Sequence, residues 1–388
     1  MRLQEVSLDD SPLGKGRIRL TGKYCFGTGG RERDQLWFDV PPHLADALST
    51  SGNPWLACLL PMAVSLNEPL ELCRPIDAGL HEGAVALMQT WSGCYPAASY
   101  RRVPIVADIL PPSPPFPGGK TVQFFTGGID SFFTLLRHAP EGDAIDRRHI
   151  DELLTIWGLD IPLEAPEAFT RVAARIASVA ESAGLSSAVM ATNLRESSWR
   201  VTHWGNIGQG PGLAGMALAL ERRYRHALLP ASVTYSVYLP YGTHPLFDPL
   251  LSTSGMRFED DGAQWTRREK LAQIMSSDVA MTQLRVCWEG RSDANCGRCE
   301  KCLRTIAMLE MLGARERAAT FPPDAWSLRA LGELRLRNDT ACRSMADLAR
   351  QAAAAGHPAI AAAARKAVSR YQRRRSIGRL LRRLRRSP

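Results

Sequence analysis

Residues 121–136 read TVQFFTGGIDSFFTLL, and three local patterns meet in this stretch. The apolar segment 121–125 has the composition of a β-strand, and a pair of glycines follows it at 127–128. Beyond the glycines, Phe132, Leu135 and Leu136 have the spacing of one face of a helix. The order of strand, tight turn and helix start predicts an α/β protein built around this turn.

The turn has the properties of a phosphate-binding loop. Paired glycines let the backbone approach a bulky anion, and the start of a helix attracts negative charge. The hydroxyl groups of Thr126 and Ser131 add donors. The loop is not a Walker loop, because no Gly-Lys-Ser/Thr sequence ends it, and it lacks the third glycine of a dinucleotide fingerprint. A plain glycine turn between a strand and a helix is the alternative interpretation.

Strands and helices alternate on the carboxyl side of this loop. Apolar β-type segments at 121–125, 152–157, 186–191 and 227–231 are separated by helical patterns at 131–138, 167–183 and 212–224. This alternation predicts a parallel sheet with helices on both faces, whose ligands bind beyond the carboxyl ends of the strands. Candidate nucleotide contacts there are Gly158, Asn193 and Arg195. Residues 232–265 are expected to be an irregular connection. Arg267, Arg268 and Lys270 follow it as candidate cations for a phosphate or a carboxylate, and a solvated helix face is the alternative.

Five prolines among residues 111–117 predict a stiff spacer and a domain boundary. The predicted organisation is an N-terminal mixed α/β domain (1–110), a linker (111–119), a nucleotide-binding domain (120–312), a helical extension (313–364) and a basic tail (365–388).

The basic character of the chain belongs to its carboxyl end. Residues 365–388 hold eleven of the 48 Lys and Arg residues and no acidic residue, which leaves 37 basic and 39 acidic residues elsewhere. Apolar residues at 377, 380, 381 and 384 predict an amphipathic basic helix. Its expected partners are RNA, an anionic membrane surface or an acidic protein, and a solvated helix end is the alternative.

No long apolar run or signal-peptide pattern is present, so a cytoplasmic protein is expected.

Four of the nine cysteines lie close together in the sequence: Cys287, Cys296, Cys299 and Cys302. The C-x2-C-x2-C run can turn around Gly297 and deliver its third thiolate from a helix start, and Cys287 supplies a fourth ligand. Four thiolates suit a closed, structural Zn²⁺ site. An iron–sulfur cluster is the competing metal centre, and a redox pair or cysteines without metal are further alternatives.

Together, the T-G-G-I-D-S loop and the four cysteines resemble the PP-loop ATP pyrophosphatases, and in particular the 7-cyano-7-deazaguanine synthases of queuosine-precursor synthesis. The resemblance covers residues 120–312. It implies a parallel five-stranded sheet of the adenine nucleotide α-hydrolase type, ATP and Mg²⁺ as ligands, and a structural zinc. The residues to which the resemblance assigns ATP binding are Thr126, Gly127, Gly128, Asp130 and Ser131. Thr126 departs from the family's serine, and nothing in 232–265 matches a deazaguanine site.

The activity that this resemblance implies is adenylation of a carboxylate or carbonyl group, with release of pyrophosphate, and attack by ammonia or an amine. Asp130 would bind Mg²⁺, Ser131 would contact phosphate, and Arg195, Arg268 and Lys270 would stabilise transition-state charge. Sulfur transfer to a nucleobase or tRNA is the alternative within the superfamily. A zinc-stabilised nucleotide-binding protein without turnover is the alternative from another class, and an oligomer is compatible with each.

Overall fold

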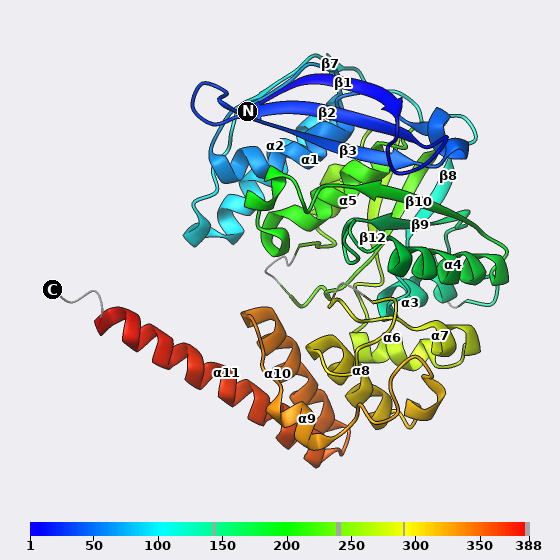
Figure 1. The fold of residues 1–388 in the computed structure, drawn as a ribbon, viewed down its shortest axis with the longest axis vertical. Coiled ribbons are helices and arrows are strands. Elements are labelled where there is room, and N and C mark those ends of the chain that lie inside the picture. Colours follow the sequence, from blue (N-terminus) through cyan, green and yellow to red (C-terminus); the bar gives the residue numbers. More distant parts are fainter. Residues whose placement is uncertain (143–144, 238–241, 290–291, 385–388) are drawn as a thin grey trace. The chain divides into compact units, whose positions relative to one another are not determined.

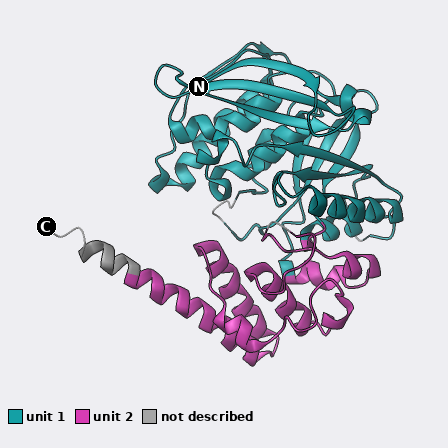
Figure 2. Ribbon diagram, viewed as in Figure 1, with its two compact units in different colours: residues 1–126, 130–267 teal, residues 127–129, 268–388 magenta. Residues whose placement is uncertain are grey.

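The computed structural model describes residues 1–388 apart from 143–144, 238–241, 290–291 and 385–388 (Figure 1). It consists of two compact units (Figure 2). The first unit holds residues 1–126 and 130–267, and the second holds residues 127–129 and 268–388. No described helix is long and apolar enough to cross a membrane.

A mixed sheet of ten strands runs through the first unit. Across the sheet the strands are β12 (Arg257–Asp261), β11 (Tyr224–Pro230), β8 (Lys120–Phe124), β9 (Glu152–Trp157), β10 (Ser186–Thr192), β3 (Glu32–Val40), β2 (Ile18–Phe26), β1 (Arg2–Asp10), β4 (Leu70–Leu72) and β6 (Ile105–Val106). A separate pair is formed by β5 (Ile76–Asp77) and β7 (Ile109–Leu110).

The five strands from β12 to β10 are mutually parallel, as expected, but they are only half of the sheet. Strand β3 pairs antiparallel with β10, so the strands of residues 1–110 continue the sheet instead of forming one of their own. Residues 36–40 of β3 are buried, which requires neighbours on both sides and on both faces. The fifth parallel strand, β12, lies within the segment 232–265 that was predicted to be irregular, so that prediction was wrong at 257–261.

The helices of the first part of the chain are α1 (Asn53–Leu66), α2 (Ala78–Cys94), α3 (Ile129–Arg137), α4 (Pro166–Ser182) and α5 (Gln209–Leu218). Short turns of 3₁₀-helix occur at Pro42–Ala47, Pro96–Ala98, Ser198–Val201 and Asp248–Leu251, and a π-helical turn at Trp204–Gly208 leads into α5. One hydrophobic core joins the two halves of the sheet. Phe38 and Trp55 belong to the same buried cluster as Val122 and Met190. This shared core explains why residues 1–110 do not separate from the strands that follow the proline-rich segment.

Helix α3 is fixed to the edge strand β12 by a buried carboxylate. Asp261 accepts hydrogen bonds from Thr134 Oγ1 (2.7 Å) and Arg137 Nη1 (2.7 Å), and His138 Nε2 lies 3.0 Å from it. Burial alone would raise the pKa of Asp261, but the bonds and charges of His138 and Arg137 hold it below its usual value. The helix that follows the glycine loop is therefore held through its last turn.

In the second unit, all regular structure within the described residues is helical. Its helices are α6 (Arg267–Ile274, whose first residue belongs to the first unit), α7 (Asp278–Gln283), α8 (Glu300–Met311), α9 (Leu328–Glu333), α10 (Asp339–Ala354) and α11 (Pro358–Leu384), with a 3₁₀ turn at Arg315–Arg317. Helix α11 packs against α9 and α10 and continues past residue 364, so the predicted extension and basic tail share one helix. Side chains 372–377 are exposed. The partners predicted for the tail stay predictions.

We expect Glu152→Gln to destabilise the first unit by about 3 kcal/mol, because it leaves Arg223 without its counter-charge. Glu152 is 1 % exposed and accepts hydrogen bonds from Arg223 (2.8 Å), Tyr224 (2.6 Å) and Ser186 (2.9 Å). Burial alone would raise the pKa of Glu152, but these bonds hold it below its usual value. The stabilisation is therefore present above the unfolded pKa of about 4.3 and is lost as the pH falls through the folded pKa.

Urea unfolding of wild type and variant at pH 7 and at pH 3.5 measures this effect. The difference between the two proteins should shrink at the lower pH. Glu5→Gln is the matched control, because its ion pair with Lys23 is half exposed and contributes less than about 1 kcal/mol. An equal loss for both variants at pH 7 would contradict the prediction.

Candidate functional site

The glycine loop follows the strand at which the chain reverses its direction across the parallel half of the sheet. From β8 the chain builds β9 and β10 on one side, and it then crosses to build β11 and β12 on the other. Open sheets of this kind bind ligands beyond the carboxyl ends of the strands on either side of such a reversal. Residues 125–130 follow the carboxyl end of β8.

Residues 126–131 have the backbone geometry of an anion-binding turn. Gly127 has a φ of +75°, which L side chains rarely adopt, so the first glycine is required by conformation. Helix α3 begins at Ile129, and the N–H groups of its first turn have no acceptor within the helix. The hydroxyl of Ser131 accepts from Thr126 N (3.2 Å) and lies 3.1 Å from Thr126 Oγ1, so these two residues close the turn.

Asp130 forms an ion pair with Arg267, whose Nη2 lies 2.5 Å from Oδ2. The sequence predicted Asp130 as a Mg²⁺ ligand and pointed to the neighbouring Arg268 and Lys270 as phosphate-binding cations. Arg268 and Lys270 belong to the second unit, where Lys270 is 2 % exposed. The roles predicted for these residues stay predictions. Arg267 was one of the predicted cations as well, and the carboxylate with which it pairs is that of Asp130.

The residues predicted beyond β9 and β10 have structural partners of their own. A Cβ on Gly158 would lie 2.0 Å from the carbonyl oxygen of Thr192, so only glycine fits where these strand ends converge. Asn193 accepts from Trp37 N (3.0 Å) and donates to Gln35 O (2.9 Å), which joins β10 to β3. Arg195 is exposed and lies over the ring of Trp204 (4.6 Å to the ring centre). Their predicted contacts with a nucleotide stay predictions.

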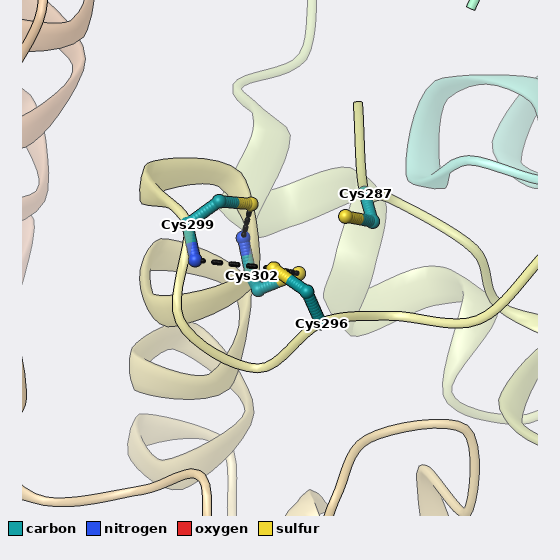
Figure 3. Close-up of side chains that lie close together, drawn as sticks. All are labelled: Cys287, Cys296, Cys299 and Cys302. Atoms are coloured by element: carbon teal, nitrogen blue, oxygen red, sulfur yellow. Dashed lines mark hydrogen bonds between the residues drawn. The ribbon is translucent and has the colours of Figure 1, made fainter. Parts of the chain in front are cut away.

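The four predicted cysteines come together in one cluster, as expected (Figure 3). The Sγ atoms of Cys287, Cys296, Cys299 and Cys302 all lie within 4.8 Å of one another. Gly297 has a φ of +68°, which turns the chain between the first two cysteines of the run. Cys299 is the N-cap of α8, and Cys302 lies in the first turn of that helix, where its N–H points to Cys299 Sγ (3.5 Å).

Crowding of the thiols makes the cluster suited to a divalent cation. Hydrogen bonds from Cys299 and Cys302 lower the pKa of Cys287 far below that of a free thiol. The same bonds raise the pKa of Cys299 to about 12 and also raise that of Cys302. A divalent ion bound between the four sulfur atoms would favour ionisation of all four thiols.

The spacing of the sulfur atoms favours one metal ion over an iron–sulfur cluster. Four sulfurs at about 2.3 Å from a single Zn²⁺ in a tetrahedron lie about 3.8 Å from one another. Cys296 Sγ and Cys302 Sγ are 3.9 Å apart, and no pair exceeds 4.8 Å. In a [4Fe–4S] cluster the four cysteines bind four different iron atoms of an eight-atom core, so their sulfur atoms lie farther apart. The cluster could therefore hold one zinc ion.

Asn295 is a residue of this centre that the cysteine pattern did not reveal. It is 3 % exposed, and its Oδ1 accepts from the backbone N–H groups of Val286 (2.9 Å) and Cys287 (3.1 Å). Its Nδ2 donates to Leu284 O (2.9 Å) and to Thr320 Oγ1 (3.0 Å). A polar residue directly before Cys296 was the only signal in the sequence. Asn295 orients the segment that carries Cys287, as residues around metal ligands commonly do.

Comparisons of the chain with models of protein families, with curated protein sequences and with solved structures find no match. The function of the protein is therefore inferred from the two motifs and from their geometry. The structure bears out the α/β architecture and the four-cysteine cluster. It leaves the chemistry at the glycine loop as a proposal.

Proposed function

We propose that the protein is an AMP-forming, ATP-dependent enzyme of the PP-loop type, with a structural zinc at its four cysteines. The observation that carries this proposal is the position of the loop 126–131. It leaves the strand at which the sheet reverses direction, it contains a glycine with positive φ, and it leads into a helix start. This combination suits the pyrophosphate portion of ATP.

In the proposed reaction, a carboxylate or carbonyl oxygen of a small substrate attacks the α-phosphorus of ATP. The bond to the β,γ-pyrophosphate breaks, and pyrophosphate leaves as Mg²⁺-bound anion. Ammonia or an amine then attacks the activated carbon and forms a C–N bond. The C–O bond to AMP breaks, AMP keeps its electron pair, and the nitrogen releases a proton to water. Most of the barrier to such a transfer is lowered by positioning and by neutralisation of charge.

The roles of the residues follow from their chemistry. Backbone N–H groups of 127–131 would hold the leaving pyrophosphate, and Asp130 would contribute an oxygen to Mg²⁺. Arg268 and Lys270 would neutralise charge that develops in the transition state. Zn²⁺ bound by four thiolates has no open position, so its contribution is to hold the second unit folded.

Sulfur transfer is the weaker candidate. PP-loop sulfur transferases often carry a reactive cysteine near the nucleotide. The cysteines outside the cluster are Cys25, Cys58, Cys73, Cys94 and Cys342. None of them directly follows β8, β9 or β10 in the chain. Burial raises the pKa of Cys58, which makes its thiol a poor nucleophile.

The test is incubation of purified protein with Mg-ATP and mixtures of small carboxylic acids and ammonia, followed by chromatography of nucleotides. We expect AMP and pyrophosphate in equal amounts, formed only when an acid is present. Formation of ADP and phosphate would overturn the proposal. Tight binding of ATP without any product across all mixtures would favour a nucleotide-binding protein without turnover.

A further inference from the structure

Within the second unit of the chain, Arg285 lies beside the first glycine of the loop. Its backbone N–H donates to the carbonyl oxygen of Gly127 (2.8 Å). A Cβ built on Gly127 would lie 3.8 Å from Cβ of Arg285, so this side chain starts directly beside the turn. Both residues belong to the same compact unit. No sequence pattern indicated Arg285, because it comes to lie beside Gly127 only when two segments far apart in the chain pair with each other.

The guanidinium group of Arg285 carries a buried charge that no described carboxylate neutralises. The residue is 6 % exposed. Its Nη2 donates to Ser292 O (3.2 Å), whereas its Nε has no hydrogen-bond acceptor among the residues that the structure describes. Arginine is rarely buried without a counter-ion, because removal of its charge from water is costly. A buried, unneutralised cation on a side chain that starts beside a glycine turn is suited to an anionic ligand.

The segment 284–287 connects this cation to the cysteine cluster. Asn295 holds it on one side through Leu284 O and the N–H groups of Val286 and Cys287. Gly127 holds it on the other through the N–H of Arg285. Only one residue separates Arg285 from the metal-ligating Cys287. The metal centre is therefore placed to fix the position of Arg285 at the loop.

The geometry points to Arg285 as a phosphate-binding residue of the glycine loop, positioned by the segment 284–287 between Gly127 and the four-cysteine centre. The inference rests on the proposed function and adds a residue to it. The ligand class is a di- or triphosphate, whose oxygens match the forked donors of a guanidinium group. The N–H groups of the turn and the arginine would then contact the same anion.

The experiment compares Arg285→Met with wild type in the full-length, zinc-loaded protein, with inorganic pyrophosphate as the probe. Methionine fills a similar volume without charge. We expect the dissociation constant for pyrophosphate to rise at least about tenfold, as for loss of a hydrogen bond to a charged group. Because the variant also removes an unneutralised buried charge, its melting temperature without ligand should be unchanged or higher. Pyrophosphate should raise the melting temperature of wild type more than that of the variant.

Arg298→Ala is the matched control, because Arg298 is exposed in the same cysteine-rich segment. It should bind pyrophosphate as wild type does, and all three proteins should contain equal zinc by mass spectrometry. Arg285→Lys should bind with intermediate affinity, because it keeps the charge and loses the fork. A lower melting temperature for Arg285→Met with unchanged pyrophosphate affinity would assign Arg285 a structural role and overturn the inference. If wild type itself binds neither pyrophosphate nor ATP, the proposed function and the inference about Arg285 both fail.

Discussion

Replacement of Cys299 by serine is expected to release the metal and to unfold the second unit. Cys299 is a ligand of the proposed zinc and the N-cap of α8, where its Sγ accepts a hydrogen bond from the N–H of Cys302. Serine can keep this N-cap bond, so the expected loss comes from the metal ligand. Structural zinc sites supply about 10–16 kcal/mol of folding free energy in small zinc-binding domains. A loss of more than about 5 kcal/mol is therefore expected, which is comparable to the whole stability of an ordinary domain.

Elemental analysis and circular dichroism measure this result. Wild type should carry about one zinc per chain, and treatment with a strong chelator should reproduce the helix loss of Cys299→Ser. Cys342→Ser is the control, because Cys342 lies on α10 of the same unit and outside the cluster. It should retain zinc and helix content. Iron with a brown colour, or full stability in the absence of metal, would rule out the structural zinc site.

Replacement of Asp130 by asparagine is expected to lower exchange of labelled pyrophosphate into ATP about 100-fold or more, if Asp130 binds Mg²⁺ at the transition state. Asparagine keeps the size of the side chain and an oxygen that can accept from Arg267, so the described contact of Asp130 survives in large part. It removes the negative charge that a Mg²⁺ ion prefers. The Asp130→Asn substitution therefore separates a role of Asp130 in catalysis from its role as the partner of Arg267.

The assay uses an acid mixture that supports AMP formation, with Mg²⁺ varied over a wide range. The Mg²⁺ concentration for half-maximal exchange should rise for Asp130→Asn. The melting temperature without ligand should fall only slightly, because the ion pair with Arg267 is partly exposed. Asp160→Asn is the control, since Asp160 is exposed in the turn after β9. Equal exchange by the two variants would show that Asp130 serves only to hold Arg267.

Sequence patterns located the parts of the fold whose signals are local. Strand β8, the glycine turn and the start of α3 follow from consecutive residues, and the alternation after them predicted parallel strands. Strand β12 could not be found this way, because Arg257–Asp261 holds three acidic residues in five. Its Asp261 is acceptable inside the protein only because Thr134, Arg137 and His138, more than 120 residues earlier, donate to it.

The antiparallel half of the sheet was recognised only as a separate domain. The residues of β3 predict a strand, but its pairing with β10 joins Phe38 to Thr192 across more than 150 positions. No local pattern carries the identity of so distant a neighbour. The proline-rich segment looked like a domain boundary, although a shared core joins the strands on its two sides.

By itself, the sequence determined the four-cysteine cluster, because C-x2-C-x2-C and a fourth cysteine close by bring thiols together through a short turn and a helix start. It also determined the glycine loop, since a positive φ at Gly127 is a property of one residue. Only the tertiary structure decided what surrounds them. Arg285 is one arginine among many in the sequence. It becomes a candidate anion ligand because folding places its N–H and Cβ beside Gly127 and buries its side chain without a carboxylate among the described residues to neutralise it.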